Sequence, residues 1–128
     1  MEQTENKKKI LVIDDDNDLN TVLVDKLNFS GFEAIGATDG VNGLDKALSL
    51  RPDAILLDLV MPKMGGLEML QLLRKDEWGK QVKVIILTLL EKVDYVADAV
   101  EGNIYGYIVK TGHSLDEIVE KVEELVNK

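Results

Sequence analysis

Short apolar runs alternate along the chain with longer segments in which apolar residues recur every three or four positions. An uninterrupted apolar run is typical of a strand buried on both faces of a sheet, and recurrence at three and four indicates an amphipathic helix. The pattern predicts strands at residues 10–13, 32–37, 54–57, 82–87 and 104–109, and helices around residues 19–27, 41–48, 67–73, 95–100 and 118–126.

Strict alternation of strands and helices predicts one α/β fold. Parallel strands joined by helices need right-handed crossovers, which place helices on both faces of the sheet. We therefore expect a (βα)5 doubly wound, five-stranded parallel sheet with the flavodoxin-like strand order 2-1-3-4-5. The 128 residues suit a single domain, 1–128, in which residues 1–7 form a frayed polar tail.

Local signals mark where the predicted helices begin and which side chains face inward. Asn17 or Asp18 is placed to cap the first helix, and the segment from Ser114 to Glu117 is a capping-box pattern ahead of the last one. In the second helix, the spacing predicts an inward stripe made by Val41, Leu44, Ala47 and Leu48.

Polar residues follow four of the five predicted strands. Asp14 and Asp15 come after the first strand and Asp58 after the third, while Thr88 follows the fourth and Lys110 the fifth. Because parallel strands share one carboxyl edge, where open α/β sheets place their ligands, these side chains should meet there. Each one alone also fits an ordinary loop, cap or surface residue, and only their joint placement favours a functional site.

Three carboxylates brought together repel one another unless a cation lies among them. An all-oxygen donor set with few protein ligands suits Mg²⁺. One carboxylate could then act as a nucleophile, while the metal, the Lys110 ammonium and the Thr88 hydroxyl stabilise the oxygens of a transferring phosphoryl group.

Composition narrows the function classes further. The net charge of −9 disfavours direct contact with nucleic acid or an anionic membrane. The chain has no cysteine, which excludes thiolate chemistry, and its single histidine, His113, excludes a multi-histidine metal site. The polar N-terminus is unlike a signal peptide, and no apolar run is long enough to span a bilayer. These features lead us to expect a cytoplasmic protein.

The chain resembles the receiver domain of two-component response regulators from residue 8 to residue 126. The resemblance rests on the run from Ile10 to Asp16, the segment from Asp58 to Pro62 with Met64, Gly66 and Leu67, then Thr88, and finally the segment from Tyr107 to Lys110.

The resemblance implies a role for each matched residue. Asp58 would be the phosphoacceptor, Thr88 and Lys110 would bind the phosphoryl oxygens, and Thr88 and Tyr107 would form the switch. Mg²⁺ would be bound directly by Asp15, Asp58 and the main-chain carbonyl of Val60, with Asp14 acting through water.

The chain departs from the family pattern around the site. Leu89 and Leu90 follow Thr88 where a small residue is usual, and Thr111 replaces the usual proline after Lys110. A non-proline cis bond costs about 2.5–4 kcal/mol, so we expect a trans Lys110–Thr111 peptide. Val60 and Leu90 cannot hydrogen-bond an attacking water, so we also expect a long-lived phosphoryl group.

The lead hypothesis is a signalling module that takes a phosphoryl group from a histidine kinase or a histidine phosphotransfer protein. Phosphorylation would change the face formed by residues 95–100, 104–109 and the last helix, which would contact a downstream protein. The module would catalyse only its own phosphorylation and dephosphorylation, and phosphorylation-dependent dimerisation is left open.

Two alternatives are weighed against this hypothesis. A Mg²⁺-dependent phosphohydrolase of the haloacid-dehalogenase type would also use a strand-end aspartate, but it carries a second aspartate where this chain has Val60. The other alternative is a phosphate-independent interaction module of receiver fold, which the intact acidic residues, Thr88 and Lys110 argue against.

Overall fold

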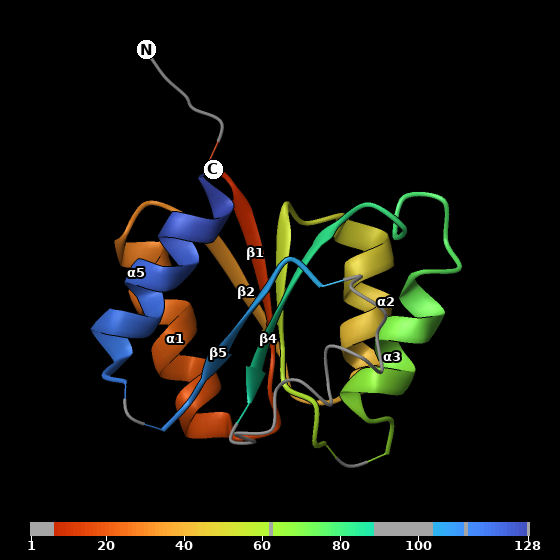
Figure 1. Cartoon of the computed structure of the whole chain (residues 1–128), viewed down its shortest axis with the longest axis horizontal. Helices are drawn as coiled ribbons and strands as arrows, with labels where there is room; N and C mark the ends of the chain where they lie inside the picture. Colours follow the sequence, from red (N-terminus) through yellow and green to blue (C-terminus); the bar gives the residue numbers. More distant parts are fainter. Residues whose placement is uncertain (1–6, 62, 89–103, 112, 128) are drawn as a thin grey trace.

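The computed structural model describes residues 7–61, 63–88, 104–111 and 113–127, and it shows the expected parallel sheet between two helical layers (Figure 1). All four strand pairings are parallel and the strand order is β2-β1-β3-β4-β5, as predicted. The strands are β1 (Lys9–Ile13), β2 (Glu33–Ala37), β3 (Ala54–Leu57), β4 (Lys83–Thr88) and β5 (Gly106–Val109).

The helices α1 (Asn17–Phe29) and α5 (Leu115–Val126) cover one face of the sheet, and α2 (Gly40–Leu50) and α3 (Gly66–Leu73) cover the other (Figure 1). The predicted helix at 95–100 lies outside the described residues. None of the helices in the described ranges is long and apolar enough to cross a membrane.

Alternation along the strands divides the core between the two layers. In β1, Ile10 and Val12 join the cluster under α1 and α5, whereas Leu11 and Ile13 join the cluster under α2 and α3. Successive strand side chains point to opposite faces, so a strand that is covered on both sides must be apolar at every position. This is why the uninterrupted apolar runs located the interior strands β1, β3 and β4 to within one residue.

Helix starts follow their caps, with one correction to the sequence prediction. The N-cap of α1 is Asp16, whose Oδ1 accepts a hydrogen bond from the backbone N–H of Leu19 at 3.1 Å; Asn17 and Asp18 are already helical. An N-cap side chain accepts a hydrogen bond from the backbone N–H two or three residues ahead. Asp16 makes this bond with Leu19, so the helix already begins at Asn17. The capping box at Ser114 and Glu117 is confirmed, with contacts of 3.1 and 2.7 Å.

The inward face of α2 differs from the prediction. Ala47 is buried as expected, but Val41 is 51% exposed and Leu48 is 39% exposed. The helix instead turns its glycines inward: a Cβ at Gly43 would lie 2.7 Å from Cδ1 of Ile13. Leu44 is partly buried and packs against the cluster under α2 and α3, as predicted. The helix lies close to β1 where Gly43 leaves room for Ile13, so Val41 and Leu48 are left at the surface.

The loop from α3 to β4 lies at the amino edge of the sheet, opposite the strand ends that carry the acidic residues. Arg74 donates from Nη1 to the carbonyls of Gly79 and Val82, at 2.7 and 2.9 Å. Trp78, in the same loop, is partly buried against the cluster under α2 and α3. These contacts hold the loop to the body of the domain.

Candidate functional site

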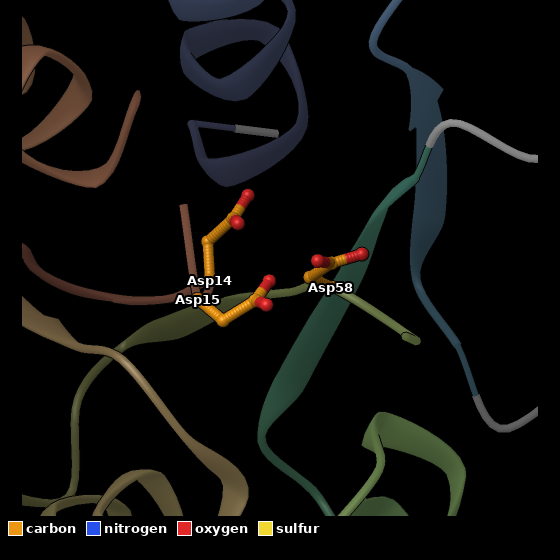
Figure 2. Close-up of side chains that lie close together, drawn as sticks. All are labelled: Asp14, Asp15 and Asp58. Atoms are coloured by element: carbon orange, nitrogen blue, oxygen red, sulfur yellow. The ribbon is translucent and has the colours of Figure 1, made fainter. Parts of the chain in front are cut away.

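Three carboxylates meet at the carboxyl edge of the sheet, as the strand arrangement requires. Asp14 and Asp15 follow β1, Asp58 follows the neighbouring β3, and one oxygen from each lies within 4.8 Å of the others (Figure 2). Asp14 and Asp58 are buried, whereas Asp15 is exposed. The cluster is the only such group of metal-ligand side chains found among the residues that the structure describes.

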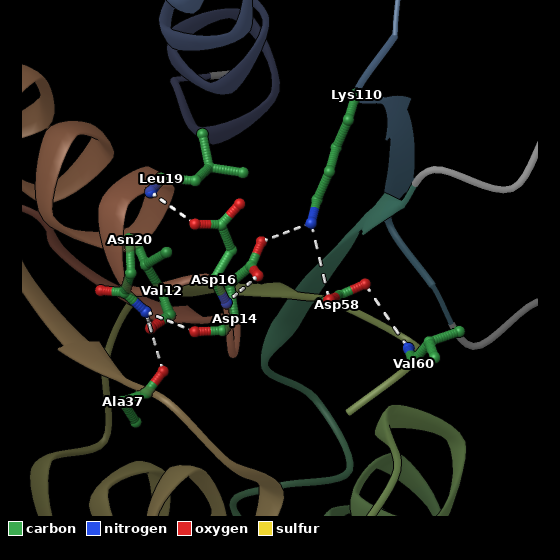
Figure 3. Close-up of polar contacts among 9 residues, drawn as sticks. All are labelled: Val12, Asp14, Asp16, Leu19, Asn20, Ala37, Asp58, Val60 and Lys110. Carbon is green, nitrogen blue, oxygen red and sulfur yellow. Dashed lines mark hydrogen bonds and ion pairs between the residues drawn. The ribbon is translucent and has the colours of Figure 1, made fainter. Parts of the chain in front are cut away.

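Lys110 provides the positive charge of the site. It directly follows β5, and its Nζ lies 2.7 Å from Asp14 Oδ2 and 3.5 Å from Asp58 Oδ2 (Figure 3). Its backbone N–H donates to the carbonyl of Thr88 at 2.7 Å, which fixes the start of the lysine side chain beside the end of β4. One ammonium is thus shared between two buried carboxylates.

Burial and charge act together on the protonation of these groups. Burial of the Asp58 carboxyl, followed by repulsion from Asp14, raises the pKa of Asp58 from 3.8 to about 6, against the opposing effect of Lys110. Burial lowers the pKa of Lys110, but its hydrogen bonds and attraction to Asp14 and Asp58 outweigh this and leave the pKa raised. Lys110 therefore stays charged, and the ionised form of Asp58 is disfavoured by its surroundings.

Backbone hydrogen bonds set the shape of the segment Asp14–Asp16, called the acidic loop below. Asp14 Oδ1 accepts from the N–H of Asp16 at 3.0 Å, and Asp16 then caps α1. The backbone N–H of Val60 points at Asp58 Oδ1 from 3.5 Å, at the limit of a hydrogen bond (Figure 3). The two oxygens of Asp14 therefore already interact with Lys110 and with the Asp16 N–H, while Asp15 and Asp58 face each other across the cluster.

The remaining predicted site residues are Thr88, Val60 and Tyr107. Thr88 is the last residue of β4 and is buried, and Val60 is 66% exposed. Tyr107 is 48% exposed and pairs with Ile86, two residues before Thr88. Alternate residues share a face of a strand, so Tyr107 and Thr88 lie on the same face of the sheet.

The loop after β5 follows the predicted geometry where it is described. No peptide bond in the described ranges is cis, and Lys110–Thr111, which lies within them, is therefore trans as expected. Leu89, Leu90 and Gly112 lie outside the described residues, so the expected effect of Leu90 on water access stays a prediction.

Asn20 is a buried polar residue at this edge that the sequence reasoning missed. It lies on α1 with its side chain directed at the ends of β1 and β2 (Figure 3). Its position in the sequence could have indicated this, because Asn20 falls between Leu19 and Leu23 on the apolar stripe of the helix. A polar residue on a buried stripe needs hydrogen-bond partners inside the protein.

Comparison with known proteins decides the family. The sequence profile described as "Response regulator receiver domain" matches residues 10–123, nearly the whole chain. The chain belongs to the response regulator receiver domain family. Membership of this family favours the signalling hypothesis over the phosphohydrolase alternative.

Two response regulators illustrate the similarity to individual relatives. The chain is 31% identical over 120 residues to the DNA-binding dual master transcriptional regulator RpaA of Synechocystis, with 94% of this chain and 49% of RpaA covered. It is 32% identical to the response regulator MprA of Mycobacterium avium, with 94% and 51% covered. The chain thus spans about half the length of these relatives.

A solved structure is similar in both sequence and fold. The response regulator TrrA of Thermotoga maritima, in complex with Mg²⁺-BeF, is 35% identical and superposes with a TM-score of 0.78, covering 92% of this chain and 98% of that one. The chain, with its strand order β2-β1-β3-β4-β5, therefore has the receiver fold.

Proposed function

We propose that this receiver domain is a phosphorylation-dependent signalling module with Asp58 as its phosphoacceptor. The observation that carries the proposal is the placement of Asp58 within 4.8 Å of two further carboxylates and 3.5 Å from Lys110, in a chain of this family. Of the three carboxylates, only Asp58 follows the central strand β3, and the Lys110 ammonium bridges it to Asp14 (Figure 3).

The proposed reaction transfers a phosphoryl group from a phosphohistidine of a histidine kinase or histidine phosphotransfer protein. A bond forms between a carboxylate oxygen of Asp58 and phosphorus, and the bond from phosphorus to the donor nitrogen breaks. The electron pair stays on the donor imidazole, which takes up a proton from solvent. Lys110 and the Thr88 hydroxyl bind the phosphoryl oxygens, where positioning and charge supply most of the catalysis.

The residues present fit a bound Mg²⁺. Three carboxylates within 4.8 Å form a hard oxygen donor set with a single ammonium to balance them. Asp15, Asp58 and the Val60 carbonyl would hold the ion directly, and Asp14 would act through water because Lys110 already occupies one of its oxygens at 2.7 Å. Bound Mg²⁺ supplies charge neutralisation for the incoming phosphoryl oxygens.

Thr88 and Tyr107 form the proposed switch. Their shared face of the sheet allows a Thr88 hydroxyl drawn toward the phosphoryl group to vacate space that the exposed Tyr107 ring can enter. The output face would be formed by residues 95–100 together with β5 and α5, and it would bind a downstream protein or a second phosphorylated copy.

The negative charge of the chain bears on which partners it contacts. RpaA is named as DNA-binding, but the net charge of −9 leads us to propose that this receiver domain does not itself contact DNA or a membrane. It would act in the cytoplasm and catalyse only its own phosphorylation and dephosphorylation.

Acetyl phosphate with Mg²⁺ tests the proposal, with intact-protein mass spectrometry as the readout. The wild type should gain one phosphoryl group, and Asp58→Asn should gain none while remaining folded. Asp53→Asn is the matched control, because Asp53 directly precedes β3, at the far edge of the sheet, and this variant should be labelled like the wild type. Labelling of Asp58→Asn at the wild-type level would contradict the proposal.

A further inference from the structure

The side chain of Asn20 binds three backbone carbonyls at once. Its Nδ2 donates to the carbonyl oxygens of Ala37 at 2.9 Å, Asp14 at 3.0 Å and Val12 at 3.3 Å (Figure 3). The amide has two hydrogens, so the three oxygens share them. All three carbonyls belong to the ends of β1 and β2 or to the residue that follows β1, where the acidic loop starts.

These contacts control the main chain of Asp14 from both sides. The carbonyl of Asp14 accepts directly from Asn20, and the N–H of Asp14 donates to Ala37, whose carbonyl also accepts from Asn20. One buried side chain therefore fixes the residue on which the acidic loop turns.

Gly36 provides the space that Asn20 needs. A Cβ built at Gly36 would lie 2.2 Å from Asn20 Oδ1 and 3.2 Å from its Cγ, far inside van der Waals contact. Any larger residue at position 36 must displace the carboxamide. Asn20 on α1 and Gly36 on β2 are complementary positions, although neither carries a charge or touches a carboxylate of the site.

We propose that Asn20 is a positioning residue for the metal site, holding the acidic loop so that Asp14 and Asp15 stay gathered before the cation arrives. This inference rests on the proposed function, in which the cluster binds Mg²⁺. Like charges spread apart when their backbone is free, and the cost of regathering them is subtracted from metal affinity. Groups that orient metal ligands without touching the metal typically change affinity by about 10–100-fold.

Mg²⁺ affinity of the unphosphorylated protein tests the proposal without any activity assay. Asn20→Ala should raise the Kd for Mg²⁺ about tenfold or more, measured by calorimetry and by the backbone NMR shifts of the acidic loop. Asn28→Ala is the matched control. Asn28 also joins α1 to β2 through an amide side chain, which accepts from Ala34 N at 2.8 Å, but it lies at the other end of the helix. Its Kd should stay within twofold of the wild type.

Gly36→Ala approaches the same contact from the opposite side. It should raise the Kd by itself, because the new methyl group displaces the carboxamide. In the Asn20→Ala background the methyl group meets no carboxamide, so Gly36→Ala should then add little. A merely structural role would make the two substitutions lower stability without this coupling in the Kd.

The outcomes separate the two claims. A folded Asn20→Ala variant with a Kd within twofold of the wild type overturns the positioning role; if this variant does not fold, Asn20→Ser and Gly36→Ala are judged by the same limit. If the wild type binds no Mg²⁺, the proposed metal site fails instead. Hydrogen exchange at the Asp14 and Asp16 amides then decides the positioning role, which faster exchange in the Asn20 variant supports and unchanged exchange overturns.

Discussion

The two edges of the sheet use charged residues in opposite ways. At the amino edge, charged side chains meet backbone groups of opposite polarity: Asp53 accepts from the N–H of Lys9 at 2.7 Å, and Lys8 and Lys83 donate to the Val126 carbonyl at 3.0 and 3.4 Å. At the carboxyl edge, the carboxylates of Asp14, Asp15 and Asp58 gather, and within the described part of the chain the ammonium of Lys110 pairs with Asp14 and Asp58 alone among them. Each of these charged side chains at the amino edge has a backbone partner of opposite polarity, whereas negative charge is in excess at the acidic cluster.

This difference separates stability from function within one domain. At the amino edge, the two lysine contacts hold the end of α5 to β4 and to the residue that precedes β1. The unbalanced cluster keeps negative charge partly buried, and the pKa of Asp58, raised to about 6, measures that cost. A cation that binds at this excess of negative charge should therefore raise the free energy of unfolding.

Removing the cation that pairs with Asp14 and Asp58 should have the largest effect. Lys110→Met leaves the buried Asp14 carboxylate unpaired, and we expect the free energy of unfolding to fall by about 3 kcal/mol in EDTA. Lys83→Met at the amino edge removes a hydrogen bond to Val126 and a cation–π contact with Tyr105, and should cost about 1 kcal/mol. Urea unfolding measures both. Equal losses would remove the contrast between the edges.

Neutralising Asp58 should have the opposite sign. Its pKa is raised in the folded state, so its charge destabilises the fold above about pH 6 and has no effect below about pH 4. A rise from 3.8 to about 6 sets an upper limit of about 3 kcal/mol, and solvent screening reduces the expected gain to about 2 kcal/mol. Asp58→Asn should therefore be more stable than the wild type at pH 7.5 in EDTA.

The pH profile provides the control for this prediction. The advantage of Asp58→Asn should shrink as the pH falls from 6 to 4, because the folded wild type takes up a proton near pH 6 and the unfolded chain does so only near pH 4, where the difference vanishes. Asp53→Asn, which weakens a backbone contact at the amino edge, should bring no gain at any pH. A stability gain for Asp58→Asn that persists at pH 4 would show that charge is not its cause.

Mg²⁺ should stabilise the carboxyl edge by a smaller amount. At a concentration ten times the Kd, binding adds about 1.4 kcal/mol, which corresponds to a Tm increase of about 5 °C. Asp15→Ala should lose most of this increase, since the exposed Asp15 carboxylate is the one best placed to take the ion directly. Asp53→Ala should keep it. Thermal unfolding followed by circular dichroism, with and without Mg²⁺, distinguishes the two.

The smallest predicted effect concerns the lifetime of the phosphoryl group. The Val60 side chain is 66% exposed beside Asp58 and cannot hold an attacking water. Val60→Asn supplies a polar group there and should speed dephosphorylation about three- to tenfold, or about 0.6–1.4 kcal/mol of activation free energy. Val22→Asn, an exposed valine on α1, should leave the decay unchanged. Equal decay in the wild type and Val60→Asn would show that this side chain does not control hydrolysis.

Much of this arrangement could be predicted from the sequence because two strong regularities act together. Uninterrupted apolar runs locate strands that are buried on both faces, and parallel connection then forces Asp14, Asp58 and Lys110 to a common edge. The family resemblance added the roles proposed for these residues, which their proximity alone does not assign.

Other features could not be predicted because they depend on contacts between distant segments. The apolar pattern of α2 pointed to Val41 and Leu48, but the close approach of Gly43 to Ile13 turned them outward. Asn20 is informative only once β2 is known to end beside it, since one of its three partners is Ala37. Packing of small residues and hydrogen bonds across the sheet leave little trace in local periodicity.

The position of Trp78 has a practical consequence for spectroscopy. The chain has one tryptophan, and its indole packs in the α3–β4 loop, at the edge of the sheet opposite the acidic cluster. Its fluorescence should report loss of the surrounding core on unfolding and respond little to an ion that enters between Asp15 and Asp58. Emission from Trp78 therefore offers an optical signal for folding that stays clear of metal quenching, and the occupancy of the acidic cluster must be followed by another probe.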